Sequence, residues 1–281
     1  MSPVRIGAVG YLNARPLVFD LEQDPRFDVR FDLPARCADL LHAGQTDLGL
    51  IPSIELLRAP GGPDAYRIVP DLAIASRGPV ASVAIFTTRD MREVRSISLD
   101  TSSRTSVALT RVMCARVFGI EPRFEGHGPD LPAMLQEADA ALIIGDQALF
   151  LDGGPVVVGE GAGTRTVTVE KIDLGQLWLE TTGLPFVYAF WAGRPGAVGP
   201  DEVRALQATR DASLGRTREI SEFYFPGDPV RQDTSDRYLR DNIKYYLGPD
   251  ERAGLELFYR YAAEAHVVPR AVTPTFFESQ G

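Results

Sequence analysis

Hydrophobic and polar positions in the first part of the chain alternate between the repeats typical of strands and of helices. The segments 5–9, 27–33 and 47–51 predict strands, whereas 14–21 and 35–43 predict helices. Strands that alternate with helices predict parallel strands with helices packed on the sheet faces. Ligands of such proteins bind beyond the carboxyl ends of the strands.

The same kind of alternation returns further along the chain. The segments 66–76 and 80–87 are rich in β-forming residues. A strand predicted at 96–100 is followed by helical spacing at 105–118, and a further strand is predicted at 140–144. These elements predict a second α/β unit.

The pattern changes after a strand predicted at 186–191, because only helical spacing follows it. The predicted C-terminal helices are 201–214, 235–247 and 249–266. Helices of this kind need a sheet to pack on, and the sheet of the N-terminal unit is available. We therefore predict that the chain leaves this unit and later returns to it.

This path predicts two lobes. Lobe one comprises residues 1–83 and 190–281 and is a discontinuous α/β lobe with C-terminal helices, whereas residues 84–189 form an α/β lobe two. The hinges are expected near Ser82 and Trp191.

Composition limits the class of partner. The 281 residues carry a formal net charge of −9 with an isoelectric point near 5.0, and no cluster of Lys or Arg reverses this charge locally. Such a surface repels nucleic acid and anionic lipid headgroups. The N-terminal segment lacks the pattern of a secretory signal. We expect a cytoplasmic protein without nucleic acid or membrane partners, and the oligomeric state stays open.

Several kinds of chemistry lack their motif in this sequence. No P-loop, G-x-S-x-G, H-E-x-x-H or Cys/His metal spacing occurs, so we expect neither a metal nor a cofactor. The two cysteines, Cys37 and Cys114, lie in apolar helical patterns and are expected to be buried reduced thiols. A flexible glycine-rich loop is expected at 159–163.

Three segments combine a strand end, a small polar residue and a helix start. They are 13–16, 52–55 and 101–105. Free N–H groups and the helix dipole attract anions at such positions, so an acidic protein can bind a carboxylate without lysine. Asn, Ser and Thr are also the ordinary N-caps of helices, and any one of the segments can be explained in that way. Three of them together favour a carboxylate ligand.

One carboxylate is expected to face the cleft. Asp146 follows Gly145 at the end of the strand predicted at 140–144. Alternatively, Asp146 forms a structural hydrogen bond on the hinge side of the cleft.

Specific motifs add a resemblance that covers nearly the whole chain. The motifs are 10–17, 44–55, 76–83, 102–106, 173–178 and 182–187. With these motifs the chain resembles the chorismate dehydratases of the futalosine route to menaquinone.

The resemblance implies a periplasmic-binding-protein-like fold of type II, an α/β fold in which two lobes with mainly parallel sheets enclose a ligand cleft. It also implies a cofactor-independent hydro-lyase, which converts chorismate to 3-[(1-carboxyvinyl)oxy]benzoate and water in menaquinone biosynthesis. Loss of the C3 proton and the C4 hydroxyl makes a benzene ring, so aromatisation drives the reaction. The protein then mainly orients a dicarboxylate substrate.

On this hypothesis Asn13 is the catalytic residue, which holds and polarises the reacting region. The predicted substrate-binding residues are Ser53, Ser82, Ser103, Arg104, Thr105, Gly145 and Asp146. Because Asn cannot act as a base at neutral pH, another group must accept the proton. The candidates are the enolpyruvyl carboxylate of the substrate and Asp146.

Two other functions remain open at this point. The 1,4-dihydroxy-6-naphthoate synthase of the same pathway has the same fold, and a non-catalytic protein that binds small anions shares it as well. Such a binding receptor normally carries an export signal. A ligand-sensing regulator would need a DNA-binding helix-turn-helix.

Overall fold

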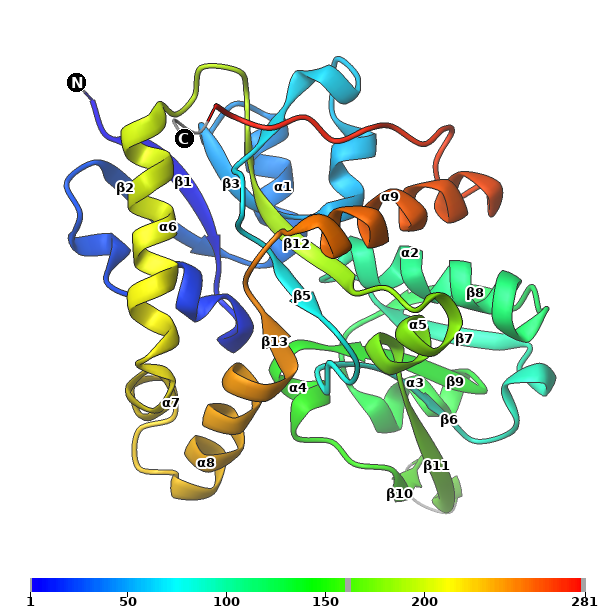
Figure 1. Ribbon diagram of the computed structural model, residues 1–281. Helices are drawn as coiled ribbons and strands as arrows, with labels where there is room; N and C mark the ends of the chain where they lie inside the picture. Colours follow the sequence, from blue (N-terminus) through cyan, green and yellow to red (C-terminus); the bar gives the residue numbers. More distant parts are fainter. Residues whose placement is uncertain (1, 160–162, 279–281) are drawn as a thin grey trace.

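Two β-sheets, each covered by helices, organise the chain in the computed structural model (Figure 1). The structure describes residues 2–159 and 163–278, so most of the glycine-rich loop predicted at 159–163 lies outside the described residues. Each sheet with its covering helices forms one lobe. None of the described helices is long and apolar enough to cross a membrane.

The first sheet has seven strands in the order β13-β5-β12-β3-β1-β2, and β4 pairs with β12. They are β1 (Val4–Val9), β2 (Phe27–Asp32), β3 (Leu48–Pro52), β4 (Arg67–Ile68), β5 (Ile74–Ser76), β12 (Phe186–Gly193) and β13 (Ile243–Lys244). β1 pairs in parallel with β2 and β3, whereas the pairs that involve β12 or β13 are antiparallel.

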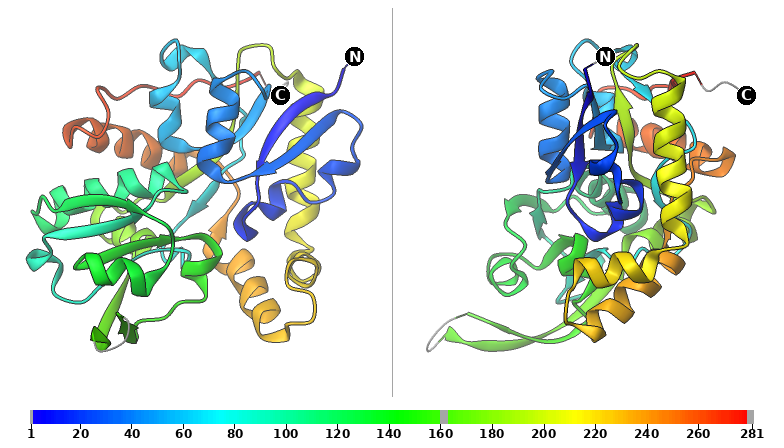
Figure 2. Two further views of the ribbon diagram at one scale, coloured as in Figure 1. Left: turned by 180° about the vertical axis from the view of Figure 1, so that it is seen from behind. Right: turned by 90° about the vertical axis from the view of Figure 1, so that its left-hand side faces the viewer.

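The second sheet has six strands in the order β10-β11-β6-β9-β7-β8. They are β6 (Val83–Thr87), β7 (Ser96–Asp100), β8 (Arg123–His127), β9 (Ala140–Ile144), β10 (Gly154–Val158) and β11 (Arg165–Asp173). β7 pairs in parallel with β8 and β9, and the other pairs are antiparallel. Strands β10 and β11 project from the lobe as a hairpin arm (Figure 2).

Helices cover both sheets. They are α1 (Pro34–His42), α2 (Arg104–Met113), α3 (Leu131–Glu137), α4 (Gly145–Leu149), α5 (Leu174–Thr182), α6 (Pro200–Leu214), α7 (Thr217–Tyr224), α8 (Pro229–Arg237) and α9 (Pro249–Glu264). Helix α1 packs on β1 and β3, and α9 packs on β12. The C-terminal helices therefore return to the first sheet, as the sequence predicts.

The predicted α/β fold class with two lobes is confirmed, with one correction. The sheets are mixed rather than mainly parallel. Strands joined by a covering helix run in parallel. The chain enters a sheet from the other lobe at β6 and at β12, and these two strands pair antiparallel with their neighbours.

The first predicted helix, 14–21, is wrong. The chain forms a 3₁₀ helix at Leu12–Leu17 and a second one at Leu21–Gln23. Pro16 has no N–H for an intrahelical hydrogen bond, and Asp20 adopts a left-handed φ of 65°, so a continuous α-helix cannot form.

The predicted helix 235–247 starts and ends earlier in the structure. Helix α8 continues as a π-helical turn at Tyr238–Asn242, and the chain then becomes strand β13. Ile243 pairs with Ser76 of β5, so tertiary pairing overrides the helical pattern of the sequence.

The hydrophobic core is largest around the first sheet and around the crossings between the lobes. Trp178 is fully buried, donates its indole N–H to the Pro185 carbonyl at 3.2 Å and packs edge-on against Phe186 and Phe258. The prediction for the cysteines is confirmed, since Cys37 and Cys114 are free, buried thiols. Burial raises the pKa of each to about 12.

The chain crosses between the sheets twice. It leaves the first sheet after β5 and enters the second at β6, and it returns through α5 to β12. All of β12 lies in the first sheet, so the return is complete at Phe186, slightly before the boundary between 189 and 190 that the sequence predicts.

Asp173 joins the two crossing segments. Its carboxylate caps α5 by accepting hydrogen bonds from the backbone N–H groups of Gly175 and Gln176, at 2.9 and 3.0 Å. The same carboxylate accepts from the N–H groups of Val80 and Ala81, at 3.0 and 2.6 Å. One side chain therefore holds four backbone donors from both crossings.

The close approach of these segments requires Gly175. A Cβ atom at this position would lie 2.6 Å from the Ser76 hydroxyl oxygen, 2.7 Å from the Gly78 carbonyl oxygen and 2.8 Å from the Tyr188 hydroxyl. The motif at 173–178 therefore has a structural explanation in the two crossings.

We predict that Asp173→Ala lowers the free energy of unfolding by about 2 kcal/mol, because it removes a helix cap and leaves backbone donors without an acceptor. Urea unfolding measures the change. Asp152→Ala, at an exposed position, serves as the control and should stay within about 0.5 kcal/mol of the wild type. Equal stability of both variants would contradict the assigned role of Asp173.

Candidate active site

A small cavity lies where the carboxyl ends of several strands meet between the two sheets. Its volume is about 40 Å³, room for about one water molecule. It is lined by Val9, Tyr11, Asn13, Pro34, Pro52, Ile74, Val80, Val83, Ser103, Ser106, Ile144, Gly145, Tyr188 and Ala189. Most of these residues lie at the ends of β1, β3 and β9 or just after them. Others lie at the start of α2, in β12 and in the first crossing between the sheets.

The lining of the cavity is neutral. None of its residues has an ionisable carboxyl, imidazole, amino or guanidinium group, and its polar groups are hydroxyls and the Asn13 amide. The hydroxyl of Tyr188 contacts that of Ser76 at 3.2 Å, and burial raises the pKa of Tyr188 well above its ordinary value. Tyr188 therefore stays protonated at physiological pH.

Asn13 has an acceptor without a partner. Its Oδ1 atom is buried and accepts no hydrogen bond from the described residues. Its backbone carbonyl accepts from the Tyr245 hydroxyl at 3.0 Å, so the turn that carries the side chain is held from the C-terminal segment. A buried amide oxygen without a partner costs free energy, and a ligand that donates to it recovers that cost.

Ser103 brings the start of α2 to the cavity. It is the N-cap of this helix, and its hydroxyl accepts from the Ser106 N–H at 3.4 Å and contacts the Ser106 hydroxyl at 3.0 Å. The first N–H groups of a helix have no intrahelical acceptor and favour an anion. The Ser103 and Ser106 hydroxyls therefore border the cavity at the start of α2.

Ser53 and Thr105 are fully buried and do not line the cavity. Their hydroxyls contact each other at 3.3 Å, the Ser53 hydroxyl donates to the Val187 carbonyl at 2.8 Å, and Thr105 Oγ1 accepts from the Ile54 N–H at 3.2 Å. Because these atoms belong to both lobes, the pair forms part of the contact between them.

Ser82 lies in the first crossing and is also buried. Its hydroxyl oxygen accepts from the Tyr238 hydroxyl at 2.7 Å. Burial raises the pKa of Tyr238 far above its ordinary value, so Tyr238 stays protonated and can donate to Ser82.

Arg104 lies outside the lining of the cavity. Its guanidinium donates to Glu55 at 3.0 Å and to Asp39 at 2.7 Å, both in the first lobe. Burial alone would raise the pKa of Glu55, but its hydrogen bond with His42 and the charges of Arg104 and Arg58 lower it overall. Arg104 therefore forms a salt bridge between the lobes.

Gly145 lines the cavity at the start of α4. Its φ of +66° is left-handed, and a Cβ atom there would lie 3.3 Å from the ring of Tyr11. Only glycine combines this backbone conformation with the close ring. The Tyr11 hydroxyl reaches across to Ser102 at 3.1 Å.

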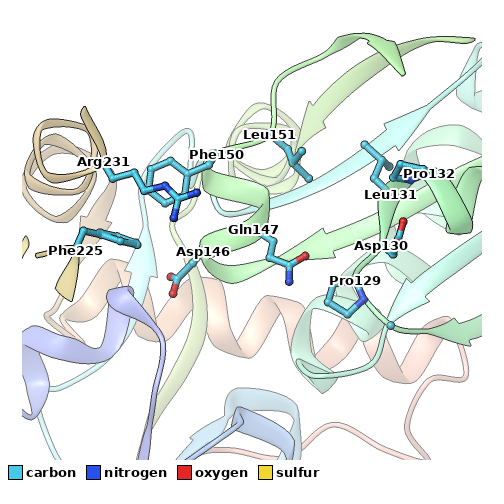
Figure 3. Close-up of a pocket in the computed structure, with 11 residues that line it drawn as sticks. Pro129, Asp130, Leu131, Pro132, Asp146, Gln147, Phe150, Leu151, Phe225 and Arg231 are labelled. Atoms are coloured by element: carbon cyan, nitrogen blue, oxygen red, sulfur yellow. The ribbon is translucent and has the colours of Figure 1, made fainter. Parts of the chain in front are cut away.

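Asp146 lines a larger groove (Figure 3) and is not among the residues that line the cavity. Its carboxylate accepts from the Leu12 N–H at 3.2 Å and from the Tyr224 hydroxyl at 2.5 Å, so it joins the second lobe to two segments of the first. The Tyr224 hydroxyl also lies 3.0 Å from the Gly10 carbonyl. Burial raises the pKa of Asp146.

Of the predicted site residues, Asn13, Ser103 and Gly145 meet at the cavity. Sequence reasoning missed Tyr11, Ser106 and Tyr188 as lining residues. Tyr11 and Ser106 lie inside the motifs 10–17 and 102–106, which was an available signal, whereas nothing local in the sequence shows that Tyr188 faces a cavity.

Solved structures show which fold this is. A protein from Archaeoglobus fulgidus superposes with a TM-score of 0.70 at 14% identity, and 95% of this chain and 99% of that chain are covered. A Candida albicans gene product, described as having the generic periplasmic binding protein fold, superposes with a TM-score of 0.61 at 10% identity over 100% and 99% of the chains. The periplasmic aliphatic sulphonate binding protein of Escherichia coli gives 0.59 at 15% identity over 100% and 95%. The fold is that of the periplasmic binding proteins.

Sequence comparison then identifies the family. The profile of a family described as menaquinone biosynthesis matches residues 4–264. A chorismate dehydratase from Thermus thermophilus is 34% identical over 282 residues, which cover 99% of each chain. This protein belongs to the menaquinone biosynthesis family, and the resemblance found in the sequence is confirmed.

The raised pKa of Asp146 predicts a pH-dependent stability. The stabilisation that comes from protonating this carboxyl is complete below its unfolded pKa and is lost as pH rises through the folded pKa. The asparagine of Asp146→Asn cannot ionise. The Tm of this variant should therefore rise relative to the Tm of the wild type as pH increases from about 4 to about 8. Thermal unfolding over this range measures the difference. Asp152→Asn is the exposed control, and a Tm difference between Asp146→Asn and wild type that is the same at every pH would contradict this role.

Proposed function

We propose that this protein is a chorismate dehydratase, a cofactor-independent hydro-lyase that converts chorismate to 3-[(1-carboxyvinyl)oxy]benzoate and water. The observation that carries the proposal is the 34% identity to the Thermus thermophilus chorismate dehydratase over 99% of both chains. The geometry of the site also supports this proposal, because the cavity between the lobes is neutral and contains the Asn13 Oδ1 atom, which has no hydrogen-bond partner among the described residues. We further propose that the enzyme works in the cytoplasm.

The chemistry suits the groups that border the cavity. Elimination removes the C3 proton and the C4 hydroxyl of chorismate and releases them as one water molecule, so no oxidant or reductant is needed. We assign to Asn13 the role of accepting a hydrogen bond from the reacting region and donating one to it. The Ser103 and Ser106 hydroxyls with the first N–H groups of α2 would hold a carboxylate. Ser82 would contribute its hydroxyl from the first crossing.

The proton acceptor is best supplied by the substrate. The residues that line the cavity include no base of suitable pKa, and the Asp146 carboxylate is engaged by Leu12 and Tyr224 on the side of the groove. The enolpyruvyl group of chorismate is attached through its ether oxygen to C3, the ring carbon that loses its proton, so its carboxylate is close to that proton. An intramolecular base of this kind needs only to be held in the reactive geometry.

Binding requires the lobes to separate. A cavity of about 40 Å³ is far smaller than the roughly 300 Å³ or more of ordinary ligand sites. We propose that the two crossings act as the hinge, with Asp173 keeping them together while the lobes move. Ser53, Thr105 and Arg104 would then contribute to closure and to the position of the α2 N-terminus rather than touch the substrate first.

The first test uses the purified protein with two substrates. Incubation with chorismate should give 3-[(1-carboxyvinyl)oxy]benzoate, detected by absorbance and mass, and incubation with the cyclic futalosine derivative should leave that compound unchanged. Formation of 1,4-dihydroxy-6-naphthoate would assign the protein to the other enzyme of the pathway. Binding of chorismate without turnover would make it a non-catalytic anion-binding protein.

The second test removes the Asn13 amide. Asn13→Ala should lower kcat for chorismate on the order of 100-fold, because a polarising hydrogen bond at the reacting centre is lost. Asn242→Ala is the matched control, since Asn242 is the other asparagine of the chain, and neither Asn242 nor Pro79, to whose carbonyl it donates, lines the cavity. If Asn13→Ala turns over at the wild-type rate with an unchanged Tm, Asn13 has no part in the mechanism.

A further inference from the structure

A ligand-sized groove adjoins the small cavity. Gly145 lines the cavity, and the next residue, Asp146, lines the groove, whose volume is about 750 Å³. Figure 3 shows its lining, which consists of Gly128, Pro129, Asp130, Leu131, Pro132, Asp146, Gln147, Phe150, Leu151, Phe225 and Arg231. The groove runs between the second lobe and the helices α7 and α8 of the first.

One end of the groove is aromatic and positively charged. The rings of Phe150 and Phe225 meet edge-to-face at 5.4 Å, and each comes from a different lobe. The guanidinium of Arg231 lies over both rings, at 5.2 and 5.6 Å from their centroids. Its side chain is 53% exposed, and its carboxylate partner is Asp228 at 3.5 Å. Arg231 therefore keeps donors available to a further anion.

The charge of the protein favours such a group for a dianionic substrate. The net charge of −9 repels a dicarboxylate, and the cavity lining offers no positive charge. Arg104 is neutralised by Glu55 and Asp39. Arg15 donates to the Gly10 carbonyl and lies over two aromatic rings, and its Nε is buried without a partner among the described residues. Arg231 differs from Arg15 because it is exposed in the groove.

We propose that the groove is an approach site, where the cyclic dicarboxylate substrate docks before it enters the cavity. One carboxylate pairs with Arg231, and the ring lies against Phe150 and Phe225. This inference rests on the proposed function and adds a second binding site to it.

The contacts of Asp146 separate this site from the cavity. Tyr224, the neighbour of Phe225, holds the Asp146 carboxylate, and the Leu12 N–H holds its other oxygen. A substrate that passes inward must displace this contact, which joins both lobes. The exposed Asp130 at the opposite end repels a carboxylate, so it orients the dianion toward Arg231.

The test compares chorismate kinetics of the full-length protein and Arg231→Gln. At low ionic strength we expect kcat/KM to fall roughly five- to tenfold through KM, with kcat within about twofold of wild type. The difference should shrink as salt is added, because screening weakens attraction between exposed charges. Arg237→Gln changes the net charge by the same amount on helix α8 without touching the groove. It should behave like the wild type, and an equal loss in both variants would overturn the proposal.

A binding measurement separates this proposal from the proposed function. Isophthalate, a flat ring with two carboxylates, is titrated into protein with labelled phenylalanine, and the ring signals of Phe150 and Phe225 are followed by NMR. Both signals should shift in the wild type and in Asn13→Ala but not in Arg231→Gln, whether or not chorismate is turned over. Ring signals that do not respond, or that respond equally in Arg231→Gln, would exclude the approach site.

Discussion

The structure depends on one carboxylate that holds two crossing segments together. Asp173 accepts hydrogen bonds from Val80, Ala81, Gly175 and Gln176, so the two connections between the lobes are tied to each other at a single point. The lobes share no sheet, and their relative position therefore follows from these crossings and from the contacts across the cleft. A hinge that is held in this way can move as a unit without separating the crossings.

The cleft combines an acidic protein with a neutral cavity. Hydroxyls, the Asn13 amide and the start of α2 replace charged groups there, and burial keeps Tyr188 protonated as a donor. Ionic contacts lie around the cavity instead, with Arg104 on Glu55 at one side and Asp146 on Tyr224 at another. Neutral donors can therefore hold a carboxylate in place without pairing it with an opposite charge.

Much of the fold could be predicted, since the strands β1, β3, β7 and β9 contain buried apolar runs and β2 alternates apolar and charged residues. The helix expected at 14–21 failed because Pro16 and Asp20 prevent it, and the end of the helix expected at 235–247 failed because Ile243 pairs with β5. Pattern reasoning also placed Asn13, Ser103 and Gly145 at strand ends, and all three line the cavity. Arg104 was expected at the ligand, but acidic residues distant in sequence engage its guanidinium.

The sequence by itself determined the fold class, the family and the positions of helix starts at strand ends, because these follow from local periodicity, caps and continuous motifs. Only the tertiary structure decided which of those polar groups remain free to bind a ligand. Ser53 and Thr105 are used in the contact between the lobes, Asp146 lines the outer groove, and Asn13 keeps a free acceptor. The reason is physical, since a hydrogen bond satisfied by a residue far away in the chain leaves no trace in the local pattern.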